Sequence, residues 1–157
     1  MKKLQKLKIT ALICALLTLI CGCSEKLAEP KCADVTSAVM SQIELPSAAE
    51  KTAENIGAYY AVDTSKITDM SVFICASGAY PDDIAVFKFT DEKAAEAGLE
   101  AVTKRLSEQT ETFTDYTPEE MYKLENPVIK QYGNYVVYCA LSDNEKAAGI
   151  IENAFKA

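Results

Sequence analysis

The stretch VIKQYGNYVVYCAL, residues 128–141, decides the fold class of this chain. Two runs rich in β-branched and aromatic residues, 128–132 and 135–141, flank Gly133-Asn134, a two-residue turn that tolerates positive φ. The pattern predicts a β-hairpin. A second hairpin is predicted upstream, where residues 70–76 and 83–89 flank a turn-forming segment, 77–82.

Helical patterns follow each hairpin. Asp91 is a predicted N-cap for the longest helix, whose buried stripe repeats at helical spacing: Ala95, Leu99, Val102 and Leu106. A linker over 111–117 is expected to lead to Pro118, in the first turn of a short helix that ends near Glu125. Ser142 or Asp143 is expected to cap a closing helix, whose apolar side is Ala147, Ile150, Ile151, Ala154 and Phe155.

Two further helices are predicted before the first hairpin. Asp34 caps the first in this prediction, its inward stripe begins at Val35, and Pro46 closes it. Ser47 caps the second, in which a single helical face carries Ala49, Ala53, Ile56 and Tyr60.

The order hairpin, helix, hairpin, helix suggests an internal duplication, ββα-ββα. Its only sequence trace is the match of residues 91–95, DEKAA, with residues 144–148, NEKAA. We therefore expect an α+β domain: an antiparallel sheet from two hairpins with helices on one face, preceded by one or two N-terminal helices. A parallel α/β sheet would need a helix between successive strands, and the hairpins argue against it.

The N-terminus has the pattern of an export signal. Residues 1–8 hold four lysines and no acid, and residues 9–20 are an apolar run. As a helix, this run covers roughly 18 Å, which is too short to span a hydrocarbon layer of about 30 Å.

The run ends in Ile20-Cys21-Gly22-Cys23, which resembles a lipobox, with an aliphatic residue at −3 and a small residue at −1 relative to Cys23. We expect residues 1–22 to be a lipoprotein signal peptide, residues 23–32 to be the lipidated cysteine and a tether, and residues 33–157 to be one α+β domain. Fatty acyl chains such as palmitate on Cys23 would hold the protein at the extracytoplasmic face of the cell membrane. An uncleaved N-terminal anchor is the alternative.

The charge of the mature chain argues against nucleic acid as a partner. All 23 acids lie after residue 22, together with 12 of the 16 bases, so the formal net charge of this part is −11. Such a surface repels phosphate backbones. The expected partners are membrane lipid, through acylated Cys23, and an envelope protein or wall component.

Three cysteines follow the anchor: Cys32, Cys75 and Cys139. Their spacing matches no zinc or CxxC pattern. Cys75 and Cys139 lie in apolar strand-like runs, where cysteine usually behaves as a small buried hydrophobe. A disulfide or thiol switch between these two is the alternative.

The chain contains no histidine, which excludes Ser-His-Asp and Cys-His catalysis and His-ligated zinc or haem. No nucleotide-binding, Walker or EF-hand motif is present, so no cofactor, metal or catalytic residue is predicted. The acidic pairs Asp82-Asp83 and Glu119-Glu120 are read as turn and helix-terminus charges, with a hydrolase using paired carboxylates as the alternative. Most of the eight tyrosines are expected to pack in the sheet and helices, and a cluster of them on a binding face is the alternative: Tyr59, Tyr60, Tyr80, Tyr116, Tyr122, Tyr132, Tyr135 and Tyr138.

Four segments carry a family resemblance: residues 81–88, PDDIAVFK; Arg105-Leu106 in the long helix; residues 113–119, FTDYTPE; and residues 133–137, GNYVV. With these, the chain from about Ala33 onward resembles the bacterial lipoprotein family with domain of unknown function 4358. The resemblance implies a lipid-anchored or secreted single domain, and it implies no activity or catalytic residue. The leading hypothesis is a non-catalytic binding or adaptor module. The alternatives are a small cell-envelope hydrolase and a Cys75/Cys139 thiol switch.

Overall fold

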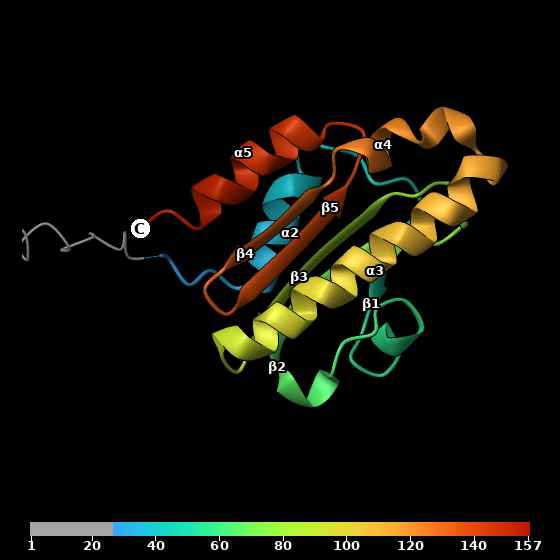
Figure 1. Cartoon of the computed structure of the whole chain (residues 1–157). Coiled ribbons are helices and arrows are strands. Elements are labelled where there is room, and N and C mark those ends of the chain that lie inside the picture. Colours follow the sequence, from blue (N-terminus) through green and yellow to red (C-terminus); the bar gives the residue numbers. More distant parts are fainter. Residues whose placement is uncertain (1–26) are drawn as a thin grey trace, which may run out of the picture.

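The computed structural model describes residues 27–157 of the chain (Figure 1). The expected signal peptide, residues 1–22, and the expected lipidation site, Cys23, lie outside the described residues. Within residues 27–157, none of the helices is both long and apolar enough to cross a membrane.

The domain is mixed α+β and is built on a five-stranded antiparallel sheet. The strands are β1 (Ala48–Lys51), β2 (Ile67–Cys75), β3 (Asp83–Phe89), β4 (Val128–Tyr132) and β5 (Tyr135–Ala140). Their order across the sheet is β1-β2-β3-β5-β4. Both predicted hairpins are present, as β2-β3 and β4-β5, and Gly133 has a φ of +55° in the turn of the second.

Four helices pack on the sheet: α2 (Cys32–Met40), α3 (Glu92–Tyr116), α4 (Tyr122–Glu125) and α5 (Asn144–Ala154). Two of the predicted caps are confirmed, since Asp91 Oδ1 accepts from the Ala94 N–H and Asp143 Oδ1 accepts from the Lys146 N–H, at 2.9 Å each. Helix α2 begins with Lys31 as its N-cap, three residues before the predicted cap Asp34.

The helices cover both faces of the sheet, and the prediction of helices on one face is wrong. Helix α3 crosses one face, while α2 and α5 lie on the other (Figure 1). The physical reason is the composition of the two central strands. Every residue of β5 is buried, and every residue of β3 except Lys88, so both faces need an apolar cover.

The second helix predicted before the first hairpin is also wrong, because the segment from Ala48 to Lys51 is strand β1. Pairing with this segment satisfies the backbone groups along the edge of β2, from Cys75 to Val72. The chain enters the strand at Ser47, whose φ is +50°. Ile56 is buried in a single 3₁₀ turn rather than on a helical face.

The sequence predicts a linker over residues 111–117, but helix α3 continues through this segment as far as Tyr116. Threonine usually weakens a helix because its hydroxyl competes for backbone groups. Here the hydroxyls of Thr112 and Thr114 donate back to the carbonyls of Glu108 and Thr110, at 2.8 and 2.6 Å. Phe113 is buried, so packing holds the last two turns in place.

The start of the described chain is bound to the domain. The Ala28 N–H donates to the Phe155 carbonyl at 3.1 Å, and the Tyr135 hydroxyl donates to the Pro30 carbonyl at 3.0 Å. Leu27 pairs with Lys156 in an isolated β-bridge. The expected tether therefore lies along the domain from Leu27 onward.

Candidate functional site

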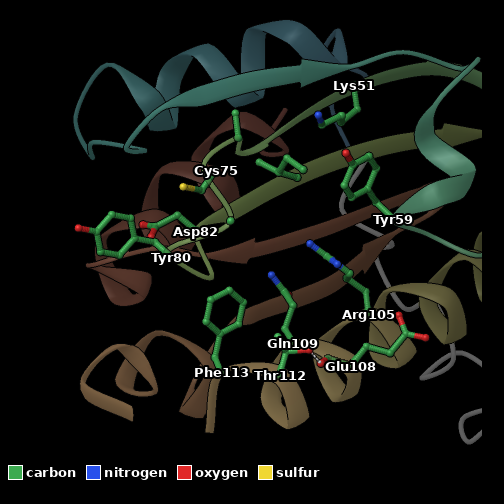
Figure 2. A pocket seen from close by; sticks show the side chains of 13 residues that line it. Lys51, Tyr59, Cys75, Tyr80, Asp82, Arg105, Glu108, Gln109, Thr112 and Phe113 are labelled. Carbon is green, nitrogen blue, oxygen red and sulfur yellow. Dashed lines mark hydrogen bonds between the residues drawn. The ribbon is translucent and has the colours of Figure 1, made fainter. Parts of the chain in front are cut away.

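A cleft of about 390 Å³ opens beside the ends of β1 and β2, over the C-terminal half of α3 (Figure 2). Lys51, Tyr59 and Arg105 lie on one side of it, and Cys75, Tyr80 and Asp82 lie on the other. The cleft combines charged, aromatic and apolar side chains, which is the usual composition of a small-ligand site.

Asp83 is the buried charge at the base of this region. Its carboxylate has no exposed surface, and it accepts hydrogen bonds from the Tyr60 hydroxyl at 2.6 Å and from Arg105 Nε at 3.1 Å. The alternation of β3 turns Asp83, like Ala85 and Phe87, toward α3. A buried carboxylate is tolerated because it is paired and hydrogen-bonded.

Burial raises the pKa of Asp83 from 3.8 to about 6, although the charge of Arg105 and the hydrogen bond from Tyr60 act in the opposite direction. Burial, together with the Asp83 charge, also raises the pKa of Tyr60 well above its usual value of 10.0. Tyr60 therefore stays protonated and donates to the carboxylate.

Gln109 extends the buried network from Asp83 to the sheet. Its Nε2 donates to the Pro81 carbonyl at 3.0 Å, and its Oε1 accepts from the Tyr138 hydroxyl at 2.5 Å. Gln109 thereby fixes the spacing between α3, the start of β3 and β5. Both the nitrogen and the oxygen of the buried Gln109 amide therefore have a hydrogen-bond partner.

Two cations lie at the ring of Tyr59. Lys51 Nζ is 4.7 Å from the ring centre, and Arg105 Cζ is 5.8 Å from it. Arg105 Cζ also lies 5.7 Å from the centre of the Tyr60 ring. The two tyrosines thus hold the guanidinium between the cleft and buried Asp83.

A second buried cluster closes the other side of the cleft. Lys123 Nζ lies 2.6 Å from Asp82 Oδ2 and 2.6 Å from Glu120 Oε2, and its side chain is only 6% exposed. Its ammonium also faces the rings of Tyr80 and Tyr122, at 5.3 and 5.8 Å. Burial disfavours its charge, but the two carboxylates outweigh this and raise the pKa of Lys123.

The acidic pairs predicted from the sequence are split by the fold. Asp82 and Asp83 bind different cations, and Glu120 joins Asp82 at Lys123, while Glu119 is exposed. Each of these three carboxylates is therefore paired with a cation within the domain. In residues 27–157 no group of three or more metal-ligating side chains is brought together.

The tyrosines separate into core and surface. Tyr60, Tyr135 and Tyr138 are buried. Tyr132 stacks on Phe155, with ring centres 4.2 Å apart. Tyr59 and Tyr80 line the cleft, and the exposed rings of Tyr80, Tyr116 and Tyr122 belong to the same end of the molecule, around the C-terminal end of α3.

All three described cysteines are free and buried. Strand β3 lies between Cys75 on β2 and Cys139 on β5, so their backbones are about two strand spacings, roughly 10 Å, apart. A disulfide requires Cα atoms within about 7 Å. The two thiols cannot bond without movement of the sheet. Cys75 Sγ instead lies 3.1 Å from the Ser77 hydroxyl.

The sequence reasoning did not find Lys51, Arg105, Gln109 or Lys123 as site residues. One signal was present in the sequence. Gln109 lies seven residues after Val102, at a position of α3 that continues the buried stripe. A polar residue at a buried helical position indicates a polar partner on the facing element.

The family model described as domain of unknown function (DUF4358) matches residues 41–141, which is more than half of the 157 residues. The chain belongs to the DUF4358 family. The matched DUF4358 segment contains all five strands, α3 and every residue of the cleft discussed above. No curated protein and no solved structure matches the chain.

Proposed function

We propose that this DUF4358 protein is a lipoprotein anchored through acylated Cys23 at the extracytoplasmic face of the cell membrane. In this proposal the domain is a non-catalytic binding module that takes its ligand or envelope partner in the cleft beside β1, β2 and α3. The lipobox-like residues 20–23 support the anchor. The open cleft supports the binding role.

The observation that carries the proposal is the separation between the cleft and the N-terminal end of the domain. Glu29 pairs with Lys88 at 2.9 Å, at one end of β3, whereas Asp83 begins β3 beside the cleft. A strand of seven residues is about 20 Å long. A domain held at its N-terminus would therefore present the cleft away from the bilayer.

Mass spectrometry of the native N-terminus tests the anchor. We expect a peptide that begins at diacylglyceryl-modified Cys23, and we expect Cys23→Ser to prevent this modification. A native chain that begins at Met1, or at an unmodified Ser24, would refute the lipoprotein proposal.

Affinity capture from native membranes tests the binding role. A component that binds in the cleft is expected to co-purify with the wild type and to be lost with Tyr80→Ser, which removes a ring 40% exposed at the rim. Tyr116→Ser is the matched control, because its ring is 64% exposed but does not line the cleft. Equal recovery of the partner with both variants would show that the partner does not bind in the cleft.

The hydrolase alternative has its own test. Incubation of the purified protein with cell-wall fragments is expected to release no product, since Asp82, Asp83 and Glu120 are held in internal ion pairs. Product formation that Asp83→Asn abolishes would replace the binding role with a catalytic one.

A further inference from the structure

The cations of the cleft indicate which class of ligand it takes. Lys51 and Arg105 lie near the same Tyr59 ring, and a negative charge between two such cations is favoured by both. Asp83 provides such a charge for Arg105 from below.

Lys51 makes no ion pair with any carboxylate in residues 27–157. Its ammonium contacts the face of Tyr59, which leaves its hydrogen-bond donors available to a ligand. Lysine on an edge strand such as β1 also discourages pairing with other chains, so the position alone does not establish a site.

Arg105 provides the second set of donors. Its Nε is bound to Asp83, and its two terminal nitrogens make no hydrogen bond within the part of the chain that the structure describes. Neither nitrogen is fully buried, and Arg105 lines the cleft, so both nitrogens are open to it. Arg105 extends into the space that Lys51 faces (Figure 2).

We propose that the cleft binds a small organic monocarboxylate. The carboxylate oxygens accept hydrogen bonds from the terminal nitrogens of Arg105 and from Lys51 Nζ, and the body of the ligand lies against the apolar wall that Ile74 and Phe113 provide. This inference rests on the proposed function, because it assumes that the cleft is the binding surface.

The ion pairs around the cleft explain the choice of a singly charged ligand. Asp82 and Glu108 also line the cleft, but they are paired with Lys123 and Lys104, and Asp83 is paired with Arg105. Lys51 is then the one lining cation in residues 27–157 without a carboxylate partner. One positive charge suits a ligand that carries one negative charge on an apolar body.

A titration of the full chain, purified in detergent and ¹⁵N-labelled, tests the inference. The probe is benzoate, and benzamide is its uncharged counterpart. Benzoate is expected to shift the amide signals of Lys51, Tyr59 and Arg105 in a saturable way, and benzamide is expected to bind at least tenfold more weakly. Equal binding of the two would overturn the inference.

Charge variants complete the test. Lys51→Gln is expected to weaken benzoate binding about tenfold, the effect of one charge-assisted hydrogen bond, and Lys51→Arg is expected to retain it. Lys93→Gln makes the same charge change outside the cleft and is expected to have no effect. Equal weakening by Lys51→Gln and Lys93→Gln would overturn the inference.

The remaining outcomes separate this inference from the proposed function. Tighter binding of inorganic phosphate than of benzoate would overturn the monocarboxylate class. An absence of benzoate-induced shifts, together with partner capture that still depends on Tyr80, would overturn the ligand class and leave the binding module in place. Benzoate binding, together with affinity capture that recovers no partner, would support the cleft as a site for a small monocarboxylate.

Discussion

Arg105 Nε donates a 3.1 Å hydrogen bond to Asp83 Oδ2, and this contact joins the middle of α3 to the first residue of β3. The two partners are unequally exposed. The Arg105 side chain is 19% exposed, whereas the Asp83 side chain has no exposed surface. The carboxylate therefore depends on internal donors for its charge, while the guanidinium retains access to water.

Replacing Arg105 is expected to destabilise the fold. Arg105→Gln leaves Asp83 as a buried charge without its cation, which typically costs about 3 kcal/mol or more. The loss is expected at neutral pH and is expected to shrink toward pH 5, because Asp83 can then take up a proton. Urea unfolding at both pH values measures it. Lys104→Gln, on the exposed side of α3, is the control, and an equal loss in both variants would contradict the prediction.

The titration of Asp83 is expected to reverse the usual acid dependence of a carboxylate. Because its pKa is raised from 3.8 to about 6 in the folded state, the folded protein holds this proton more tightly than the unfolded chain. The corresponding stability is fully present below about pH 4 and is lost as the pH rises through 6. The difference in unfolding free energy between the wild type and Asp83→Asn, measured from pH 4 to 7, reports this loss. A difference that stays constant over the range would rule it out.

Two helical glycines are expected to respond oppositely to alanine. A Cβ at Gly98 would overlap the buried ring of Phe89, so Gly98→Ala is expected to destabilise the protein by about 1–3 kcal/mol. Gly149 in α5 has open space around it, and Gly149→Ala is expected to stabilise the protein by about 0.5–1 kcal/mol. Thermal unfolding of the two variants checks both signs. Stabilisation by Gly98→Ala would show that the α3–β3 contact is looser than described.

The thiols of Cys32 and Cys139 are expected to resist oxidation in the native protein. Burial raises the pKa of Cys32 and of Cys139, and the thiolate is the form that reacts. Treatment with diamide followed by peptide mass spectrometry without reduction is therefore expected to find no link between Cys75 and Cys139. Recovery of that linked peptide from folded protein would require the strands to separate, and it would restore the thiol switch.

The local patterns predicted the elements that local contacts determine. The strand predicted over residues 83–89 has the observed bounds of β3, and Asp91 and Asp143 cap the helices that follow the two hairpins. These features depend on neighbours within a few residues: a turn, a cap or an alternation of side chains. A single sequence displays such features directly.

The features that were missed depend on distant partners. β1 is a strand because the edge of β2 needs a partner, and its own composition does not require one. The apolar runs of β3 and β5 need helices on both faces of the sheet. The prediction of two hairpins did not show that these strands would be buried on both faces. The site likewise joins Tyr60 to Asp83, 23 residues away, and Asp82 to Lys123, 41 residues away, and no local pattern links these positions.

The β-bridge between Leu27 and Lys156 places the two ends of the described chain side by side. A short peptide could therefore connect residue 157 to residue 27, and the chain could be opened instead in the turn at Gly78, whose φ is +67°. Such a circular permutant would keep the order of strands in the sheet but would have its new ends at the rim of the cleft. If it were lipidated there, the domain would be turned over, with its binding surface toward the bilayer.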